Sequence, residues 1–331
     1  MKNSIKTVFV IIGTLIGAGF ASGQEIYSFF NRYQENGILG IIVACLITGF
    51  VIYRVLKISN KENIKSYHEF LERKNNFKIL KYSINIIINL FLLMSFYIMA
   101  SGFTAYFKQE FNIPTIVITI IVLLLCYATF MKNIEGIAKI NSIMIPILIV
   151  IVLLIGMKTN IIETAKNLNL NNIELSGNWI LKSVEYASYN SILLIPILIS
   201  LKNYAKNNEK RISILATSIF FILSMIVYLI MFQFENVGNI EIPMVHIASK
   251  FGSVFKYGYG IVIIFAIYST MISAGFGFLQ NCTKSKKTYK VLAMVMCIFI
   301  IFISNLSFSN LVNLTYPVFG VLGLVQFIYM R

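Results

Sequence analysis

Long apolar runs recur along the chain, separated by short segments rich in lysine, asparagine and glutamate. Each run has about the length needed to cross the hydrocarbon core of a bilayer, which takes about 20 helical residues. Because lipid offers no partners for backbone polar groups, we expect these runs to be helices. The pattern predicts an all-α integral membrane protein, with a single membrane domain over residues 1–331 and ten transmembrane helices. The expected spans are Ile5–Phe30, Gly37–Leu56, Leu80–Phe107, Ile113–Met131, Ile137–Met157, Trp179–Leu201, Ile212–Phe234, Tyr257–Leu279, Val291–Ser304 and Leu311–Met330.

The ten spans fall into two sets of five with a nearly constant offset. The first begins at Ile5 and the sixth at Trp179, about 174 residues later, and the other pairs have nearly the same separation. Because five is an odd number, the second set must enter the membrane from the opposite side. The spacing predicts inverted repeats over about residues 5–157 and 178–330, an architecture of secondary transporters with the binding site at the repeat interface.

The first span has an unusual middle, with the sequence IIGTLIGAGFASGQE over Ile11–Glu25. Its four glycines weaken a helix by about 1 kcal/mol each relative to alanine. A break in a membrane helix is tolerated where it lines a cavity inside the protein, and the freed backbone groups can then hold a ligand. The alternative is close helix packing through a G-x-x-x-G pair. Because Ser22, Gln24 and Glu25 accompany the glycines, we favour a break near Gly17–Gly19.

The sixth span carries a polar stripe within NWILKSVEYASYNSILLIPILISL. Lys182, Glu185, Tyr186, Tyr189 and Asn190 follow the spacing of one helical face. A charge at the centre of a membrane helix costs about 2.5–3.5 kcal/mol, so this face should meet a cavity or partners. A structural ion pair between Glu185 and Lys182 is the alternative. From the repeat, we expect a second unwound segment at Ala187–Asn190, facing the first at mid-bilayer.

Two more spans carry polar residues. In the third span a polar face is predicted to include Tyr97, and in the eighth Ser269, Thr270 and Ser273 lie close together. Hydroxyl groups in membrane helices often bond to their own backbone. They could equally complete an oxygen shell for Na⁺ with carbonyl groups from about Gly13–Gly17. The other members of the third-span face are Asn85, Asn89, Ser101 and Thr104.

Near the inner end of the fifth span, Lys139 and Asn141 suggest an interface anchor. A buried cation that replaces Na⁺ is the alternative reading of Lys139.

Composition and charge placement exclude other classes. The chain is 58% hydrophobic and 12% charged, whereas soluble domains have about 25% charged residues. Of 28 lysines and arginines, 21 lie in loops on the N-terminal side of the expected spans. Positive residues stay in the cytoplasm, which predicts a plasma-membrane protein with both termini inside. The net charge of +15 therefore reflects topology and contact with the lipid bilayer, and we expect no nucleic-acid partner. With two isolated histidines and no aspartate, we expect no enzyme and no cofactor.

The motif GTLIGAGFASGQEIYSFF, together with EYASYNSILLIP in the sixth span, resembles the YkvI family of bacterial membrane proteins. That family is related to the amino acid–polyamine–organocation transporters with the LeuT-type five-plus-five fold. The resemblance covers essentially the whole chain. It implies discontinuous first and sixth helices, with a small substrate held between them and the third and eighth. By position, Gly17, Ala18 and Gly19 match the unwound segment, and Ser269 and Thr270 match hydroxyls at a shared Na⁺ site.

The sequence departs from those relatives in three ways. It lacks the extra eleventh and twelfth helices of many members, which puts dimer contacts in doubt. It lacks an evident aspartate at the ion sites, and it has Glu25 where many relatives have no acid. The departures concern assembly and ion coupling, and the family itself implies no particular substrate.

The sequence predicts a secondary active transporter of a small organic solute, an amino acid or amine, driven by Na⁺ or H⁺. The alternative is a ligand-sensing receptor subunit on the same fold, like those of spore germination. The candidate substrate-binding residues are Gly17, Ala18, Gly19, Ser22, Glu25, Tyr97, Glu185, Tyr186, Tyr189 and Asn190. The candidate Na⁺ site combines Gly13, Gly17, Ser269, Thr270 and Ser273.

Overall fold

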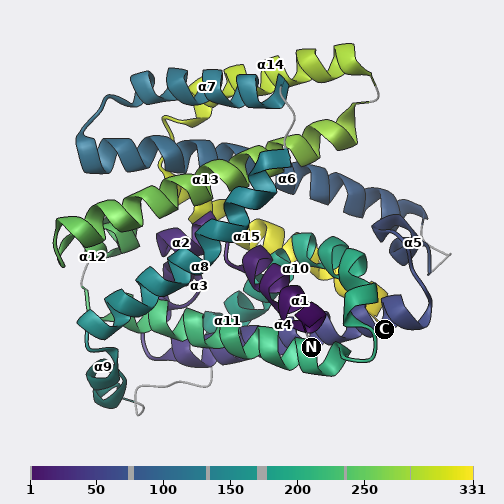
Figure 1. Cartoon of the computed structure of the whole chain (residues 1–331), viewed down its shortest axis with the longest axis horizontal. Coiled ribbons are helices and arrows are strands. Elements are labelled where there is room, and N and C mark those ends of the chain that lie inside the picture. Colours follow the sequence, from purple (N-terminus) through teal and green to yellow (C-terminus); the bar gives the residue numbers. More distant parts are fainter. Residues whose placement is uncertain are drawn as a thin grey trace.

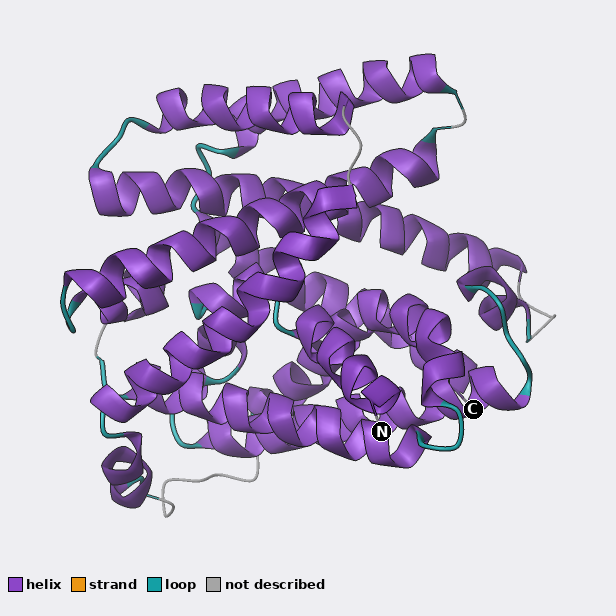
Figure 2. Ribbon diagram, in the orientation of Figure 1, coloured by secondary structure: helices purple, strands orange, loops and turns teal. Residues whose placement is uncertain are grey.

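The computed structural model describes residues 2–73, 78–131, 135–169, 177–234, 237–283 and 285–330. Within these residues all regular structure is helical (Figure 2). The α-helices are α1 (Lys2–Leu15), α2 (Ala18–Ser22), α3 (Gln24–Phe29), α4 (Asn36–Lys61), α5 (Tyr67–Glu72), α6 (Lys78–Phe111), α7 (Thr115–Met131), α8 (Glu135–Lys158), α9 (Ile161–Asn167), α10 (Asn178–Ala205), α11 (Glu209–Phe232), α12 (Pro243–Ser249), α13 (Ser253–Cys282), α14 (Lys286–Ile303) and α15 (Phe308–Gly323). Short 3₁₀ helices are η1 (Asn31–Tyr33), η3 (Val237–Asn239) and η4 (Leu324–Met330).

Helices occupy each of the ten expected spans. Within the described residues, six helices are long and apolar enough to cross a membrane: α4, α6, α10, α11, α13, and α15 continued by η4. A seventh results if residues 146–158 of α8 and the helix α9, bent by 61°, form one span. Two shorter apolar helices, α7 and most of α1, do not reach that length by themselves. The all-helical prediction is confirmed in the described residues.

The helices pack in pairs that are distant in sequence (Figure 1). α10 packs against α4, α15 and α1, and α1 also contacts α11. α13 packs along α6 and α8, while α7 and α14 lie side by side at one edge. Large rings fill the interior, because Tyr186, Phe29 and Phe220 are almost fully buried. Around the broken first segment, α1 packs against α10 and α11, α2 against α13, and α3 against α15.

The first segment consists of three short helices. The i to i−4 bonding of α1 ends where the Ile16 N–H bonds to the Ile12 carbonyl, and it resumes where the Ala21 N–H bonds to the Gly17 carbonyl. The predicted break therefore exists, at residues 16–17, although Gly19 itself lies in α2. A second break at Gly23 has φ of 86°, a left-handed conformation that glycine adopts without steric cost.

The expected unwinding of the sixth span is wrong. α10 runs without interruption from Asn178 to Ala205, across Ala187–Asn190. The stretch has no glycine, and its polar side chains bond to their own helix: the Asn190 amide donates to the Tyr186 carbonyl at 2.9 Å, and the Ser191 hydroxyl to the Ala187 carbonyl at 2.6 Å. The equivalent position in the proposed repeat is therefore not enough to unwind this helix.

Candidate functional site

A cavity of about 430 Å³ lies at the first break of the first segment. Its wall comes from α1, α2, α3, α6, α10, α13 and α15. Nine predicted site residues line it: Gly13, Gly17, Ala18, Gly19, Glu25, Tyr189, Asn190, Thr270 and Ser273. The remaining lining residues are Thr14, Leu15, Phe91, Leu92, Ser95, Met99, Leu193, Pro196, Ile197, Ala274 and Tyr316. The structure thus brings together residues that are up to about 300 positions apart in sequence.

The break supplies backbone polar groups to this cavity. The carbonyl groups of residues 13–16 and the N–H groups of residues 17–20 fall between the helical bonding of α1 and that of α2. Carbonyl groups at a helix end carry partial negative charge, and N–H groups at a helix start carry partial positive charge. The cavity wall therefore offers acceptors and donors a few residues apart.

Glu25 is the acidic residue of the cavity wall. The side chain of Glu25 is 5% exposed, and its carboxylate accepts hydrogen bonds from the Tyr189 hydroxyl and the Phe20 N–H. None of the ion pairs found within the described residues includes it. Gly19 permits its position, because a Cβ atom there would overlap the carboxylate. The site thus holds a buried carboxylate with neutral partners only.

An aromatic cluster closes one side of the cavity. The Tyr189 ring stacks on Phe29, with centroids 5.6 Å apart, and on Tyr316, at 4.9 Å. Phe91 meets Tyr189 at 6.4 Å. Because the Tyr189 hydroxyl also donates to Glu25, this one side chain joins the aromatic cluster to the acid.

Hydrogen bonds tie the broken segment to the α12 side of the molecule. The Gln24 side-chain amide donates to the carbonyl groups of Ile240 and Glu241. The Tyr259 hydroxyl donates to the Ala21 carbonyl at 2.6 Å. A further bond, from the Ile242 N–H to the Gln109 side chain at 3.0 Å, joins the chain before α12 to α6 instead. The cavity lies on the other side of α2 from these bonds, toward Gly13 and Pro196.

The hydroxyl groups of α13 divide between two environments. Thr270 and Ser273 line the cavity, as do Gly13 and Gly17. Ser269 is buried outside the cavity wall, and its hydroxyl donates to the Ala266 carbonyl at 3.1 Å. The proposed oxygen shell thus reduces to two hydroxyls and the carbonyl groups at the break. The side chains of Lys139 and Asn141 lie outside the described residues.

Four predicted substrate residues lie outside the cavity wall. The Glu185 carboxylate pairs with the Lys182 ammonium at 2.6 Å, which is the structural alternative considered from the sequence. The Ser22 hydroxyl donates to the Gly19 carbonyl at 2.7 Å and so stabilises the α2 turn. Tyr97 packs against Phe96, and Tyr186 against Phe29 and Phe30.

Ser95, Phe91 and Tyr316 line the cavity but were not predicted from the sequence. α6 presents Phe91, Ser95 and Met99 to the cavity, at steps of four residues. The predicted polar face of the third span is not the lining face, because Asn85 is exposed and Ser101 and Thr104 lie at a separate outer pocket. A search for mixed aromatic and hydroxyl faces, rather than the most polar face, would have found Ser95.

No family model matches the chain. The uncharacterized membrane protein YkvI of Bacillus subtilis is 24% identical over 328 residues, covering 96% of this chain and 92% of its own length. The uncharacterized protein YyaD of the same organism is 27% identical over 332 residues, covering 98% and 94%. The resemblance to YkvI inferred from the two motifs is confirmed by these homologues.

Solved structures of transporters share the fold. A mutant manganese transporter from Eremococcus coleocola superposes with a TM-score of 0.66 at 13% identity, over 98% of this chain and 77% of its own. A Na⁺-coupled sialic acid symporter, in its substrate-bound outward-open state, gives a TM-score of 0.60 at 16% identity, over 97% and 76%. The chain therefore has the fold of these membrane transporters, with several membrane-length apolar helices.

Proposed function

We propose that this chain is a secondary active transporter of a small organic solute, an amino acid or amine, and not an enzyme. The observation that carries the proposal is the cavity at the first break, where a buried carboxylate and freed backbone groups line the same wall. Broken helices at the centre of a transporter hold substrates and coupling ions in this way. The sharing of a fold with two solute carriers supports the same class.

The ten-helix arrangement of two inverted repeats is part of the proposal, and the packing supports it. If the first segment corresponds to α10, α4 to α11, α6 to α13, α7 to α14 and α8 to α15, then contacts should occur in equivalent pairs. α1 contacts α11 while α10 contacts α4, and α8 contacts α13 while α15 contacts α6. One local difference is that only the first of the two lead segments is broken.

We propose that the chain lies in the plasma membrane with both termini in the cytoplasm. The basic residues support this orientation, since 21 of 28 lie in loops on the side of the N-terminus. The hydrogen bonds between the Gln24 side chain and the chain before α12 then lie on the extracellular side. The cavity lies toward Gly13 and Pro196, in the halves of their helices nearer the cytoplasm. In the proposed orientation, this conformation would correspond to an inward-facing state.

The cavity chemistry suits a zwitterion or an amine. A solute ammonium would pair with Glu25, whose carboxylate has neutral partners, and desolvated pairs of this kind are strong. A solute carboxylate would accept from the N–H groups of residues 17–19. The rings of Tyr189 and Phe91 would contact its apolar part. Among the described residues, no three His, Cys, Asp or Glu side chains group as a metal site, which disfavours a transition metal as cargo.

The coupling ion is Na⁺ or H⁺, and the cavity offers a group for each. Thr270 and Ser273, with carbonyl groups near Gly13, would supply oxygen ligands for Na⁺. Glu25 would carry a proton, because it is the acidic side chain that lines the cavity. An ion drives transport only through its different affinity for the two conformations.

Solute uptake into proteoliposomes tests the function. Purified protein is first screened with amino acids and amines by thermal unfolding, since a ligand at 100 times its Kd stabilises by about 2.7 kcal/mol. Radiolabelled hits are then followed into vesicles with an imposed Na⁺ or proton gradient. We expect uphill uptake with one gradient and exchange of labelled for unlabelled solute. Binding without uptake or exchange would contradict transport and favour the sensor.

A further inference from the structure

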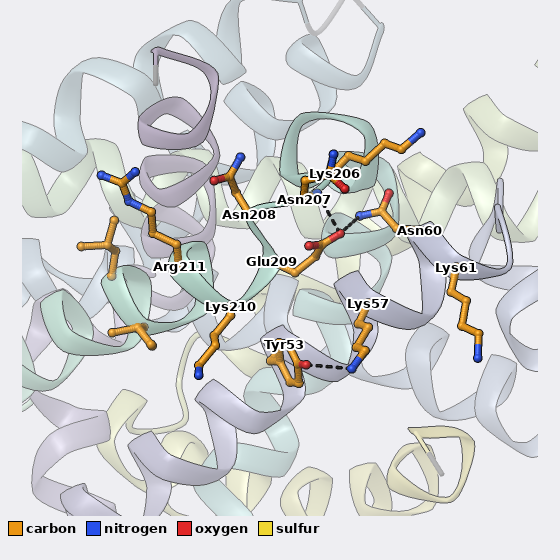
Figure 3. Close-up of a pocket in the computed structure, with 12 residues that line it drawn as sticks. Tyr53, Lys57, Asn60, Lys61, Lys206, Asn207, Asn208, Glu209, Lys210 and Arg211 are labelled. Atoms are coloured by element: carbon orange, nitrogen blue, oxygen red, sulfur yellow. Dashed lines mark hydrogen bonds between the residues drawn. The ribbon is translucent and has the colours of Figure 1, made fainter.

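A second, basic pocket lies where α4 ends and α11 begins, with a volume of about 780 Å³ (Figure 3). It is at the same end of the molecule as the C-terminal segment, because the Arg54 guanidinium on α4 donates to the Met330 carbonyl. Five basic side chains surround it and point in different directions: Lys57, Lys61, Lys206, Lys210 and Arg211. All five are exposed to solvent.

The positive charge of this pocket is not neutralised by the protein. Glu209 is the acidic residue in its wall, and the carboxylate accepts from the Asn60 amide at 2.7 Å and the Asn207 N–H at 3.2 Å. Within the described residues, no ion pair involves any of the five basic side chains. Lys57 instead donates to the Tyr53 hydroxyl at 2.9 Å. Five cations and one anion leave a local net charge of +4.

The pocket also has an apolar edge. Ile214 and Leu215, one turn into α11, form part of the wall and are 55% and 39% exposed. α11 is one of the membrane-length apolar helices, so the same pocket meets both a charged surface and an apolar helix face. A soluble anion would use only the first of these features, whereas a lipid would use both.

We propose that this pocket binds the headgroup of an anionic phospholipid, with its acyl chains along the exposed face of α11. The phosphate oxygens accept charge-assisted hydrogen bonds from lysine and arginine, and each basic residue near an anionic leaflet contributes about 1 kcal/mol. Ile214 and Leu215 contact the start of the acyl chains. The site is separate from the solute cavity, and its occupancy does not depend on the solute.

The test uses the full-length protein in detergent with added dioleoylphosphatidylglycerol or dioleoylphosphatidylcholine, and measures bound lipid by native mass spectrometry. The variant Lys57→Gln/Lys210→Gln/Arg211→Gln removes three cations from the pocket. The matched control Lys286→Gln/Lys287→Gln/Lys290→Gln removes three exposed cations at the start of α14. We expect phosphatidylglycerol to bind at least tenfold better than phosphatidylcholine to the wild type and the control. The pocket variant should lose about tenfold to a hundredfold of that binding, more at low salt.

Three outcomes would overturn the assignment. Equal losses in the two triple variants would mean that only the total charge matters. Unchanged binding in the pocket variant would mean that phosphatidylglycerol binds elsewhere. Inorganic phosphate is a separate arm, measured by thermal unfolding. If phosphate alone stabilises the wild type as much as phosphatidylglycerol does, and the pocket variant loses both effects, the pocket is a site for soluble anions.

Discussion

The first segment and α10 hold corresponding positions in the proposed repeats, yet they meet the cavity in different ways. The first segment is broken and contributes backbone groups together with Glu25. α10 is continuous and contributes the side chains of Tyr189, Asn190 and Leu193. The local sequence accounts for the difference, because Gly17, Gly19 and Gly23 have no counterparts in the middle of α10. A shared position in a repeat therefore fixes where a helix lies, while glycine content and local contacts decide whether it unwinds.

The two segments also differ in the partners of their buried acidic side chains. Glu25 faces the cavity with neutral partners, whereas Glu185 pairs with Lys182 and packs against Gly320 of α15, where a Cβ atom would clash with it. The first arrangement leaves a carboxylate available to a ligand or a proton. The second commits its carboxylate to an ion pair within α10. Four experiments can break or sharpen this contrast.

The largest effect is expected for Gly19→Leu. The added side chain would occupy the position of the Glu25 carboxylate and displace it from its bond with Tyr189. A solute ammonium would then lose the charged partner proposed for it, which costs about 1.5–3 kcal/mol, so solute affinity should fall by about tenfold to a hundredfold. Isothermal titration measures it. The matched control is Gly17→Ala, where an added Cβ meets no atom within 4 Å. Full affinity in Gly19→Leu would contradict the cavity as the binding site.

Next comes the exchange of each acid for its amide. Glu25→Gln should remove the pH dependence of uptake if this carboxylate carries the coupling proton, and it should weaken amine binding, with little change in thermal stability. Glu185→Gln should lower stability by about 1–3 kcal/mol, because Lys182 loses its charged partner. Uptake against external pH and thermal unfolding are measured for both. Identical profiles for the two variants would remove the distinction between a functional and a structural acid.

A smaller effect is expected at the α13 hydroxyls. If Na⁺ is the coupling ion, Thr270→Ala/Ser273→Ala should reduce solute binding in Na⁺ and leave binding in K⁺ or choline unchanged. Ser269→Ala is the control, since Ser269 is buried outside the cavity wall. Binding is compared in the three salts at fixed ionic strength. Equal binding of the wild type in all three would exclude Na⁺ coupling and leave the proton at Glu25.

The smallest effect is expected for Ala187→Gly, which puts a glycine of the first-segment kind into α10. A single glycine in a helix costs about 1 kcal/mol relative to alanine, so the variant should unfold at a slightly lower temperature and still bind solute. Ala187 is fully buried, and the helix around it is closely packed. If binding were lost without a fall in stability, α10 would be closer to unwinding than its continuous bonding indicates.

Much of this architecture follows from the sequence because it depends on strong and local signals. Apolar length placed helices over all ten expected spans, and the glycines of Ile11–Glu25 located the break. Tyr189 and Asn190 were found because polar residues inside an apolar span must face a partner or a cavity. These predictions needed no knowledge of how the helices pack.

The predictions of cavity-lining residues were wrong where helix packing determines which side chains reach the cavity. Glu185 and Tyr186 share the stripe of Tyr189, but α4 and α15 cover that part of α10 and leave only Tyr189 and Asn190 at the cavity. Tyr316 was missed because nothing in its own span marks it as different from other membrane-interface tyrosines. Tyr316 reaches the cavity wall by stacking on Tyr189, which is 127 positions away in the sequence.

The hydrogen bonds on the α12 side set a scale for how often the opposite path can open. Two bonds from Gln24 and one from Tyr259 must break if α2 and α3 are to separate from their neighbours there. At about 1 kcal/mol each, they bias the equilibrium by about 3 kcal/mol, or a factor of about 150. In the proposed orientation the outward-open form would then make up about 0.6% of empty molecules. A solute or ion that binds this form about 150-fold more tightly would make the two forms equally populated.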